Sequence, residues 1–135
     1  MKKVVLDTNL YVGWLNAGLH EDLILGPGFV RYLSGVVYME LAAGAQTTAA
    51  RRALAQLRAG YERGDRFVLP SVNLYERAGY LLPKLRRSGH DVRRASFVND
   101  VLIALSARSL GATVFTADAD FEAIRAVEDF AMERA

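Results

Sequence analysis

The stretch TVFTADADF, residues 113–121, has the pattern of a strand that runs directly into a group of carboxylates. Residues 113–115 are apolar or β-branched, and Asp118 and Asp120 follow shortly after Thr116. Short β-branched and aromatic runs bounded by polar residues are typical of strands. The two carboxylates either cap the next helix or belong to a site assembled from several parts of the chain.

Strand-like and helix-like segments alternate along the chain on both sides of this stretch. Strands are predicted at KVVLD (3–7), SGVVYM (34–39), RFVLP (66–70), ATVFT (112–116) and, at the sheet edge, EDFAM (128–132). Helices are predicted over 8–18, from 40 onward, and over 47–64, 71–89, 92–111 and 120–127. Such alternation favours an α/β fold with a mostly parallel central sheet covered by helices on both faces.

Two of these helices carry further local signals. The helix over 47–64 places Leu54, Leu57 and Tyr61 on one apolar stripe, as expected of a helix that packs on a core. In the helix over 71–89, Ser71 is the predicted N-cap and Gly89 the predicted end.

Length and composition limit the class of protein. The 135 residues, with 52% apolar and 24% charged side chains, predict one globular domain spanning 1–135. The chain has no cysteine, which excludes disulfides, thiol nucleophiles and cysteine-ligated zinc. Asp7 interrupts the first apolar run, and no stretch approaches a membrane span of about 20 apolar residues. We therefore expect a cytoplasmic protein with no membrane partner.

Charge is distributed unevenly along the chain. Residues 31–94 contain 12 basic and 5 acidic side chains, whereas residues 95–135 contain 3 basic and 7 acidic ones. Most of the cations are arginines, whose planar guanidinium suits phosphate better than a point charge does. This favours a nucleic-acid partner, although arginine-rich helices are also common solvated surfaces.

Acidic residues follow three of the predicted strands. Asp7 ends the first, Glu40 follows the second in the first turn of a helix, and Asp118 and Asp120 follow the fourth. The carboxyl ends of parallel strands meet at one edge of the sheet, where ligands bind in α/β proteins. We therefore expect these carboxylates to lie close together.

Asp100 is the fourth member of this group. It lies in FVNDVLIALSA, a helix that is apolar nearly all round, and shares a face with Ala104 and Ala107, which would allow close approach to the sheet. A buried carboxylate is costly unless a cation or a metal ion accompanies it.

Each acid also has a purely local explanation. Asp7 could cap the helix that starts near Asn9, and Asp100 could lie in a first turn capped by Asn99. Glu40 could be an ordinary first-turn glutamate that the helix dipole favours. Asp120 is most simply the N-cap of the last helix, and we predict that role for it.

Four independent caps, however, need not converge on one edge. Crowded carboxylates raise one another's pKa values and oppose folding unless a cation offsets them. Oxygen ligands suit Mg²⁺ and similar hard cations. The chemistry that fits is metal-assisted hydrolysis of a phosphodiester.

The ordered segments VVLDTN, VVYMELAAG and NDVLIALSARSLGATVFTADADF resemble PIN-domain ribonucleases, and in particular the VapC-type toxins of toxin–antitoxin pairs. The resemblance covers nearly the whole chain and implies a three-layer α/β/α sandwich. It places the family's catalytic acids on Asp7, Glu40, Asp100 and Asp118. Asp7 and Asp100 would be the principal ligands of Mg²⁺ or Mn²⁺, while Glu40 and Asp118 would shape the metal and water network.

The resemblance also implies supporting residues and one departure. Thr8, Asn9 and Thr116 match supporting polar positions, and Asp120 matches an acid often found before the phenylalanine. A hydroxyl residue commonly lies three positions before the glutamate, but here that position is Val37, so a supporting hydrogen bond is expected to be missing.

By resemblance, the protein would be a homodimer that cleaves RNA endonucleolytically and is inhibited by a cognate antitoxin. The apolar segment 11–29 includes Trp14, Leu15, Leu19, Leu23, Ile24 and Leu25. We expect about half of these side chains in the core and the remainder, including Trp14, in a groove that binds an antitoxin helix.

A basic ridge, PKLRRSGHDVRR (83–94), is the candidate for holding RNA. The hypothesis is that Arg86, Arg87, Arg93 and Arg94 flank the acidic edge and contact RNA phosphates. The alternatives are a solvated ridge, with cations favoured at a helix C-terminus, and RNA binding by Arg51, Arg52 and Arg58 instead.

Two other classes of protein also carry acidic residues at strand ends. A phosphoacceptor receiver domain needs a second acid after the first strand and a lysine after a late strand, and the chain has neither. A non-catalytic α/β binding module that retains the acidic cluster remains the alternative, and it predicts no cation in the pocket of Asp7 and Asp100.

Overall fold

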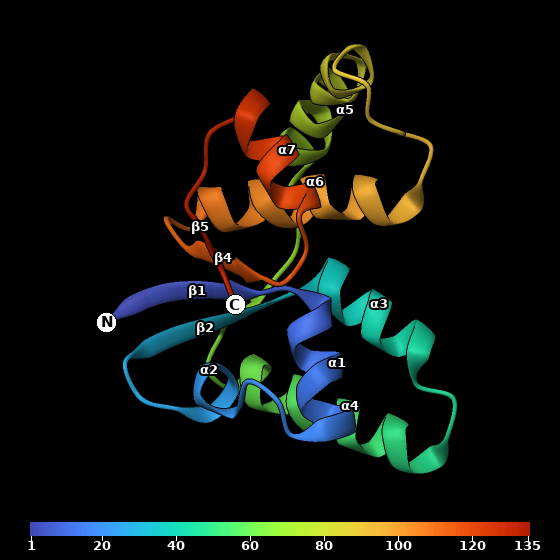
Figure 1. Cartoon of the computed structure of the whole chain (residues 1–135). Helices are drawn as coiled ribbons and strands as arrows, with labels where there is room; N and C mark the ends of the chain where they lie inside the picture. The colour runs from blue at the N-terminus through green and yellow to red at the C-terminus, as the bar shows by residue number, and fades with distance from the viewer.

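A five-stranded, wholly parallel sheet with the order β3-β2-β1-β4-β5 forms the middle layer of the computed structural model, which describes residues 1–135 (Figure 1). The strands are β1 (Lys2–Leu6), β2 (Phe29–Ser34), β3 (Phe67–Val68), β4 (Thr113–Thr116) and β5 (Met132–Arg134). Strand β1 is central, with Val5 beside Tyr32 on one side and Val114 on the other. Its apolar residues are therefore buried, as expected for a parallel sheet covered on both faces.

Helices cover both faces of this sheet. They are α1 (Thr8–Ala17), α2 (Glu21–Leu25), α3 (Gly35–Gly44), α4 (Thr48–Arg63), α5 (Val72–Arg87), α6 (Ala95–Ser109) and α7 (Asp120–Val127). Figure 1 shows α1, α2 and α4 on one face and α5, α6 and α7 on the other, with α3 leaving the end of β2. Helix α3 contacts α1 and α6 from the two outer layers. The predicted three-layer α/β/α fold is confirmed.

The position predicted for the second strand was wrong. Residues 34–39 were expected to be extended, but β2 ends at Ser34 and α3 begins at Gly35. The Ser34 hydroxyl accepts hydrogen bonds from the amides of Val36 and Val37 at 3.1 and 3.5 Å and so caps the helix. The two valines are buried on the helix despite their β propensity. As a result, Glu40 lies in the second turn of α3 and not in its first.

Two other local interpretations also change, and a third is confirmed. The last strand lies at 132–134, not at 128–132, and Glu128 ends α7 while pairing with Arg77 and Arg108. Helix α6 begins at Ala95, so Asp100 is not in a first turn capped by Asn99. The predicted cap of α5 is confirmed, because the Ser71 hydroxyl accepts a hydrogen bond from the Leu74 amide at 3.2 Å.

Helix α6 is buried on nearly all sides, as its apolar sequence predicted. Phe97, Val101 and Ile103 are at most 1% exposed, and so are Ala104 and Ala107. These alanines allow α6 to pack closely against β1 and β4. The burial of this helix brings Asp100 into the interior beside the ends of the strands. None of the helices combines the length and the apolar character that a bilayer crossing requires.

Candidate active site

The predicted acidic residues meet in one cavity at the carboxyl ends of β1 and β4. The cavity has a volume of about 320 Å³ and is bordered by α1, α3 and α6. It is lined by Asp7, Thr8, Asn9, Val12, Glu40, Ser96, Asp100 and Asp118. Parallel pairing of β1 with β4 places the residues that follow Leu6 next to those that follow Phe115. The sheet topology therefore assembles side chains that are about 110 positions apart in sequence.

Asp7 is buried between β4 and the start of α1. Its Oδ1 accepts a hydrogen bond from the Thr8 amide at 2.7 Å, and its Oδ2 accepts one from the Thr116 hydroxyl at 2.8 Å. Asp7 is also the N-cap of α1, so its local role and its place in the site coexist. Burial raises the pKa of Asp7 to about 6, against the lowering effect of the bonds from Thr116 and Thr8.

Asp100 is 4% exposed and has one oxygen, Oδ2, that is buried with no hydrogen-bond partner. Burial, together with the smaller effect of the negative charges of Asp7, Asp118, Glu40 and Asp120, raises its pKa to about 8. A buried acceptor without a partner costs about 1–3 kcal/mol. A cation bound to this oxygen would supply the missing contact and offset the repulsion between the carboxylates.

Glu40 and Asp118 complete the predicted quartet. The Thr8 hydroxyl donates to Glu40 Oε1 at 2.7 Å. Val37 lies where the family commonly has a hydroxyl residue; it is fully buried in the core and has no polar side-chain atom to offer. The hydrogen bond that holds Glu40 comes from Thr8 instead. The Asp118 amide donates to the Thr116 hydroxyl at 2.9 Å, which connects Asp118 to Asp7 through one side chain.

Asp120 was predicted to cap α7, and this was wrong. The N-cap position is Ala119, and Asp118 Oδ1 accepts the hydrogen bond from the Asp120 amide at 2.9 Å. The Asp120 side chain instead accepts a hydrogen bond from Arg94 Nη2 at 2.6 Å. Carboxylate oxygens of Asp100, Asp118 and Asp120 lie within 4.8 Å of one another, so Asp120 belongs to the acidic cluster.

The donor set suits a hard divalent cation. All the polar side chains that line the cavity, and that of Asp120 beside them, offer oxygen atoms, the ligands that Mg²⁺ and Mn²⁺ prefer. Asp100 has a free buried oxygen, and the oxygens of Asp7 keep lone pairs beyond the hydrogen bonds that they accept. The residues present therefore fit a metal ion.

Two polar residues contribute to the edges of the site. Asn9 Oδ1 accepts a hydrogen bond from the Ala117 amide at 3.5 Å, which joins the start of α1 to the loop after β4. Ser96 lines the cavity and was missed by sequence reasoning. It precedes Asp100 by four residues, and this one-turn spacing on α6 is the signal that could have found it.

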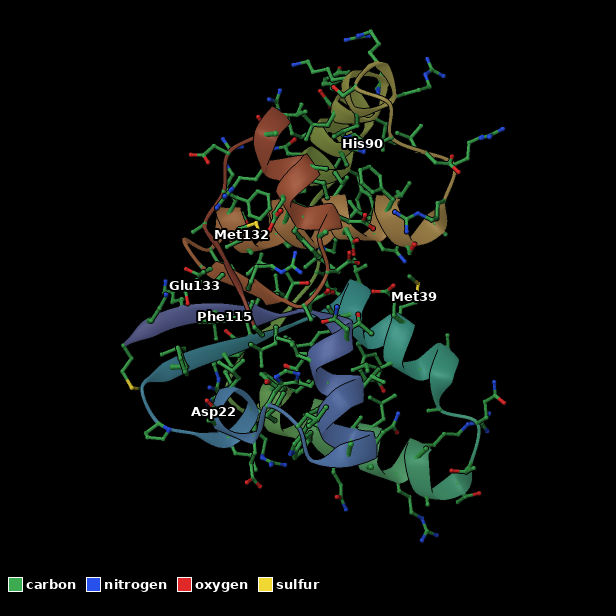
Figure 2. The ribbon with its side chains drawn as sticks, viewed as in Figure 1. Asp22, Met39, His90, Phe115, Met132 and Glu133 are labelled. Atoms are coloured by element: carbon green, nitrogen blue, oxygen red, sulfur yellow. The ribbon has the colours of Figure 1, made fainter.

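The four ridge arginines do not act as one group. Arg94 contacts the acidic cluster through Asp120. Arg86 and Arg93 line a separate surface cavity of about 570 Å³, together with His90 and Asp91. Figure 2 shows His90 near α5, well away from Met39 on α3. Arg87 is exposed in the last turn of α5.

The side chains of the apolar segment 11–29 also fall into separate groups, some in the core and others along two different cavities. Tyr11 and Ile24 belong to the core. Leu15 is 44% exposed and, with Val12, lines a groove of about 260 Å³ between α1, α3 and α4. Trp14 packs against the core and lines a different cavity, of about 280 Å³.

Known proteins share this fold. One similar solved structure is VapBC-5 from Mycobacterium tuberculosis, a member of the VapBC family of toxin–antitoxin systems, with 27% identity, a TM-score of 0.66 and 100% of each chain covered. A second is VapBC2 from Rickettsia felis bound to a promoter DNA fragment, with 21% identity, a TM-score of 0.69 and 98% of each chain covered. A third is DNA-bound VapBC from Salmonella typhimurium, with 22% identity, a TM-score of 0.69 and coverage of 99% of this chain and 98% of that one. No curated protein sequence matches the chain.

The family comparison agrees with the resemblance seen in the ordered acidic motifs. The family model of the PIN domain matches residues 4–127, a span that contains all four predicted catalytic acids. The chain therefore belongs to the PIN domain family.

Proposed function

We propose that the chain, as a single PIN domain over 1–135, is a metal-dependent endoribonuclease that hydrolyses RNA phosphodiester bonds and acts as a VapC-type toxin. The observation that carries this proposal is the buried, partnerless Oδ2 of Asp100, which lies in a cavity with three further carboxylates. Such a cluster opposes folding unless a cation binds it. Membership in the PIN domain family supports the nuclease activity.

Asp7 and Asp100 would hold Mg²⁺ or Mn²⁺ directly. When bound, the metal polarises a phosphoryl oxygen and lowers the pKa of a water molecule. Glu40 Oε1 is held by Thr8, which leaves Oε2 to orient the attacking water and to take up its proton. The Thr116 hydroxyl is hydrogen-bonded to both Asp7 and Asp118 and so fixes their relative positions. Asn9 holds the loop that carries Asp118. Asp120 supports the cluster from the first turn of α7.

A toxin of this class requires an antitoxin, and the similar solved structures support such a partner. The groove between α1, α3 and α4 is mostly apolar and shares Val12 and Glu40 with the acidic cavity. An antitoxin helix that buries apolar side chains against Val12, Leu15 and Leu54 would therefore lie next to the catalytic acids. The homodimer implied by the family likeness completes the proposed assembly.

The test is cleavage of total RNA by the purified chain with Mg²⁺ or Mn²⁺, followed by sequencing of the new ends. Asp7→Asn and Asp100→Asn are each expected to abolish cleavage while circular dichroism shows an unchanged fold. Asp91→Asn, at an exposed carboxylate outside the cavity, is the matched control and should cleave normally. Cleavage by either active-site variant at the wild-type rate would refute the assignment. A wild-type chain that neither cuts RNA nor binds Mn²⁺ would support the alternative, a non-catalytic binding module.

A further inference from the structure

Arg94 is the one ridge arginine that the structure attaches to the acidic cluster. Its Nη2 donates to Asp120 Oδ2 at 2.6 Å, and its guanidinium carbon lies 5.7 Å from the centroid of the Phe97 ring. Phe97 is 1% exposed and therefore provides a fixed surface. Asp120 in turn lies within 4.8 Å of Asp100 and Asp118, measured between carboxylate oxygens.

Most of the hydrogen-bonding capacity of Arg94 is free. A guanidinium has five N–H donors, and the Arg94 side chain uses one of them, toward Asp120. About half of the side chain is open to solvent, so the remaining donors can reach a ligand. Arg93, its neighbour, is 92% exposed and pairs only with Asp91 at 3.5 Å. The cation–π contact with Phe97 and the bond to Asp120 thus orient one guanidinium at the edge of the cavity.

We propose that Arg94 is a positioning residue that binds a phosphate of the RNA at the edge of the acidic site. This inference rests on the proposed ribonuclease function. An acidic pocket repels a phosphodiester, and a guanidinium fork offers parallel N–H donors to phosphate oxygens. In the absence of RNA, the same positive charge partly offsets the carboxylates through Asp120.

The two roles predict effects of opposite sign for one substitution. Arg94→Ala removes a cation next to the metal site and is expected to tighten Mn²⁺ binding about threefold to tenfold, the size expected of one partly screened charge. The same variant is expected to slow single-turnover RNA cleavage at saturating Mn²⁺ by at least about tenfold, the order lost with one charge-assisted phosphate contact. A residue with a purely structural role would not strengthen metal binding.

The experiment uses the whole chain with three variants. Arg94→Lys keeps the charge and loses the fork, so it should leave the Mn²⁺ affinity unchanged and still slow cleavage. Arg125→Ala, at an exposed arginine on α7, is the control and should change neither quantity. Calorimetric titration gives the Mn²⁺ affinity, and thermal unfolding confirms that every variant is folded.

RNA binding is measured separately from catalysis in an Asp7→Asn background. There, Arg94→Ala should reduce the slope of log affinity against log salt by about 0.7, as expected for one phosphate contact on a single strand. The reduction should be the same for unrelated RNA sequences, because phosphate contacts carry no base information.

Unchanged Mn²⁺ affinity together with an unchanged salt slope would overturn the role of Arg94, and so would cleavage at the wild-type rate by Arg94→Ala. A wild-type chain that cuts no RNA would instead refute the proposed function. The two failures are distinguishable because the metal titration and the salt slope do not depend on cleavage.

Discussion

Replacing Asp100 by asparagine is expected to stabilise the metal-free protein at alkaline pH, although it removes a residue of the proposed site. The pKa of Asp100 is about 8 in the folded chain, against an ordinary value of 3.8, and burial is the main cause. A raised pKa means that the folded state binds more protons than the unfolded state between these two values. The free energy of unfolding therefore falls as pH rises from about 4 to about 8.

The size of the effect follows from this shift. Each pKa unit corresponds to 1.36 kcal/mol, so ionisation of Asp100 lowers the free energy of unfolding by about 4 kcal/mol between pH 4.5 and pH 8. Asparagine has no such dependence. Its side-chain amide group takes the place of the partnerless Oδ2, and leaving this buried polar group unpaired lowers the free energy of unfolding by about 1–3 kcal/mol at either pH. The difference between the two pH values is therefore the quantity that reports on the buried charge.

The assay is thermal and urea unfolding in the presence of EDTA at pH 4.5 and pH 8. The Tm difference between Asp100→Asn and wild type should be about 15 °C more favourable to the variant at pH 8 than at pH 4.5, as expected for about 4 kcal/mol in a domain of this size. Asp91→Asn, at an exposed carboxylate, is the control and should show no such gain. Added Mn²⁺ should stabilise the wild type at pH 8 much more than the variant.

An equal effect of Asp100→Asn at both pH values would refute the reasoning, because it would show that Asp100 bears no destabilising charge. A variant less stable than wild type at pH 8 in EDTA would refute it as well.

Two further predictions concern the residues that hold the site together. Thr116→Val removes the hydrogen bond to Asp7 Oδ2 and leaves the Asp118 amide without its acceptor. We expect the free energy of unfolding, measured in urea, to fall by about 1–3 kcal/mol. The acidic limb of the pH–rate profile should move to higher pH, because the lost hydrogen bond lowers the pKa of Asp7 in the wild type. An acidic limb at the wild-type pH would contradict this prediction. Ser34→Ala removes the cap of α3, which carries Glu40, and should cost about 1–2 kcal/mol in urea unfolding. A cost below about 0.5 kcal/mol would show that packing, and not the cap, sets the start of this helix.

The sequence by itself determined the class of fold and the meeting of acidic side chains at one edge of the sheet. Alternating apolar segments predicted a parallel α/β sheet, and the parallel arrangement implied that Asp7 and Asp118 follow strands at the same edge. The nearly continuous apolar character of α6 predicted its burial and, with it, the burial of Asp100. These features could be predicted because they depend on local periodicity and on a general rule of parallel sheets.

Only the tertiary structure decided where β2 ends and how the charged side chains pair. Val36 and Val37 have strand propensity, but core packing and the Ser34 cap make them helical, which moves Glu40 by a turn. Local pattern suggested that Asp120 caps α7, whereas the fold pairs it with Arg94, 26 positions earlier. The same fold separates Arg94 from Arg86 and leaves Asp100 Oδ2 without a partner. Such contacts join distant parts of the chain, and they depend on how the layers pack rather than on any local pattern.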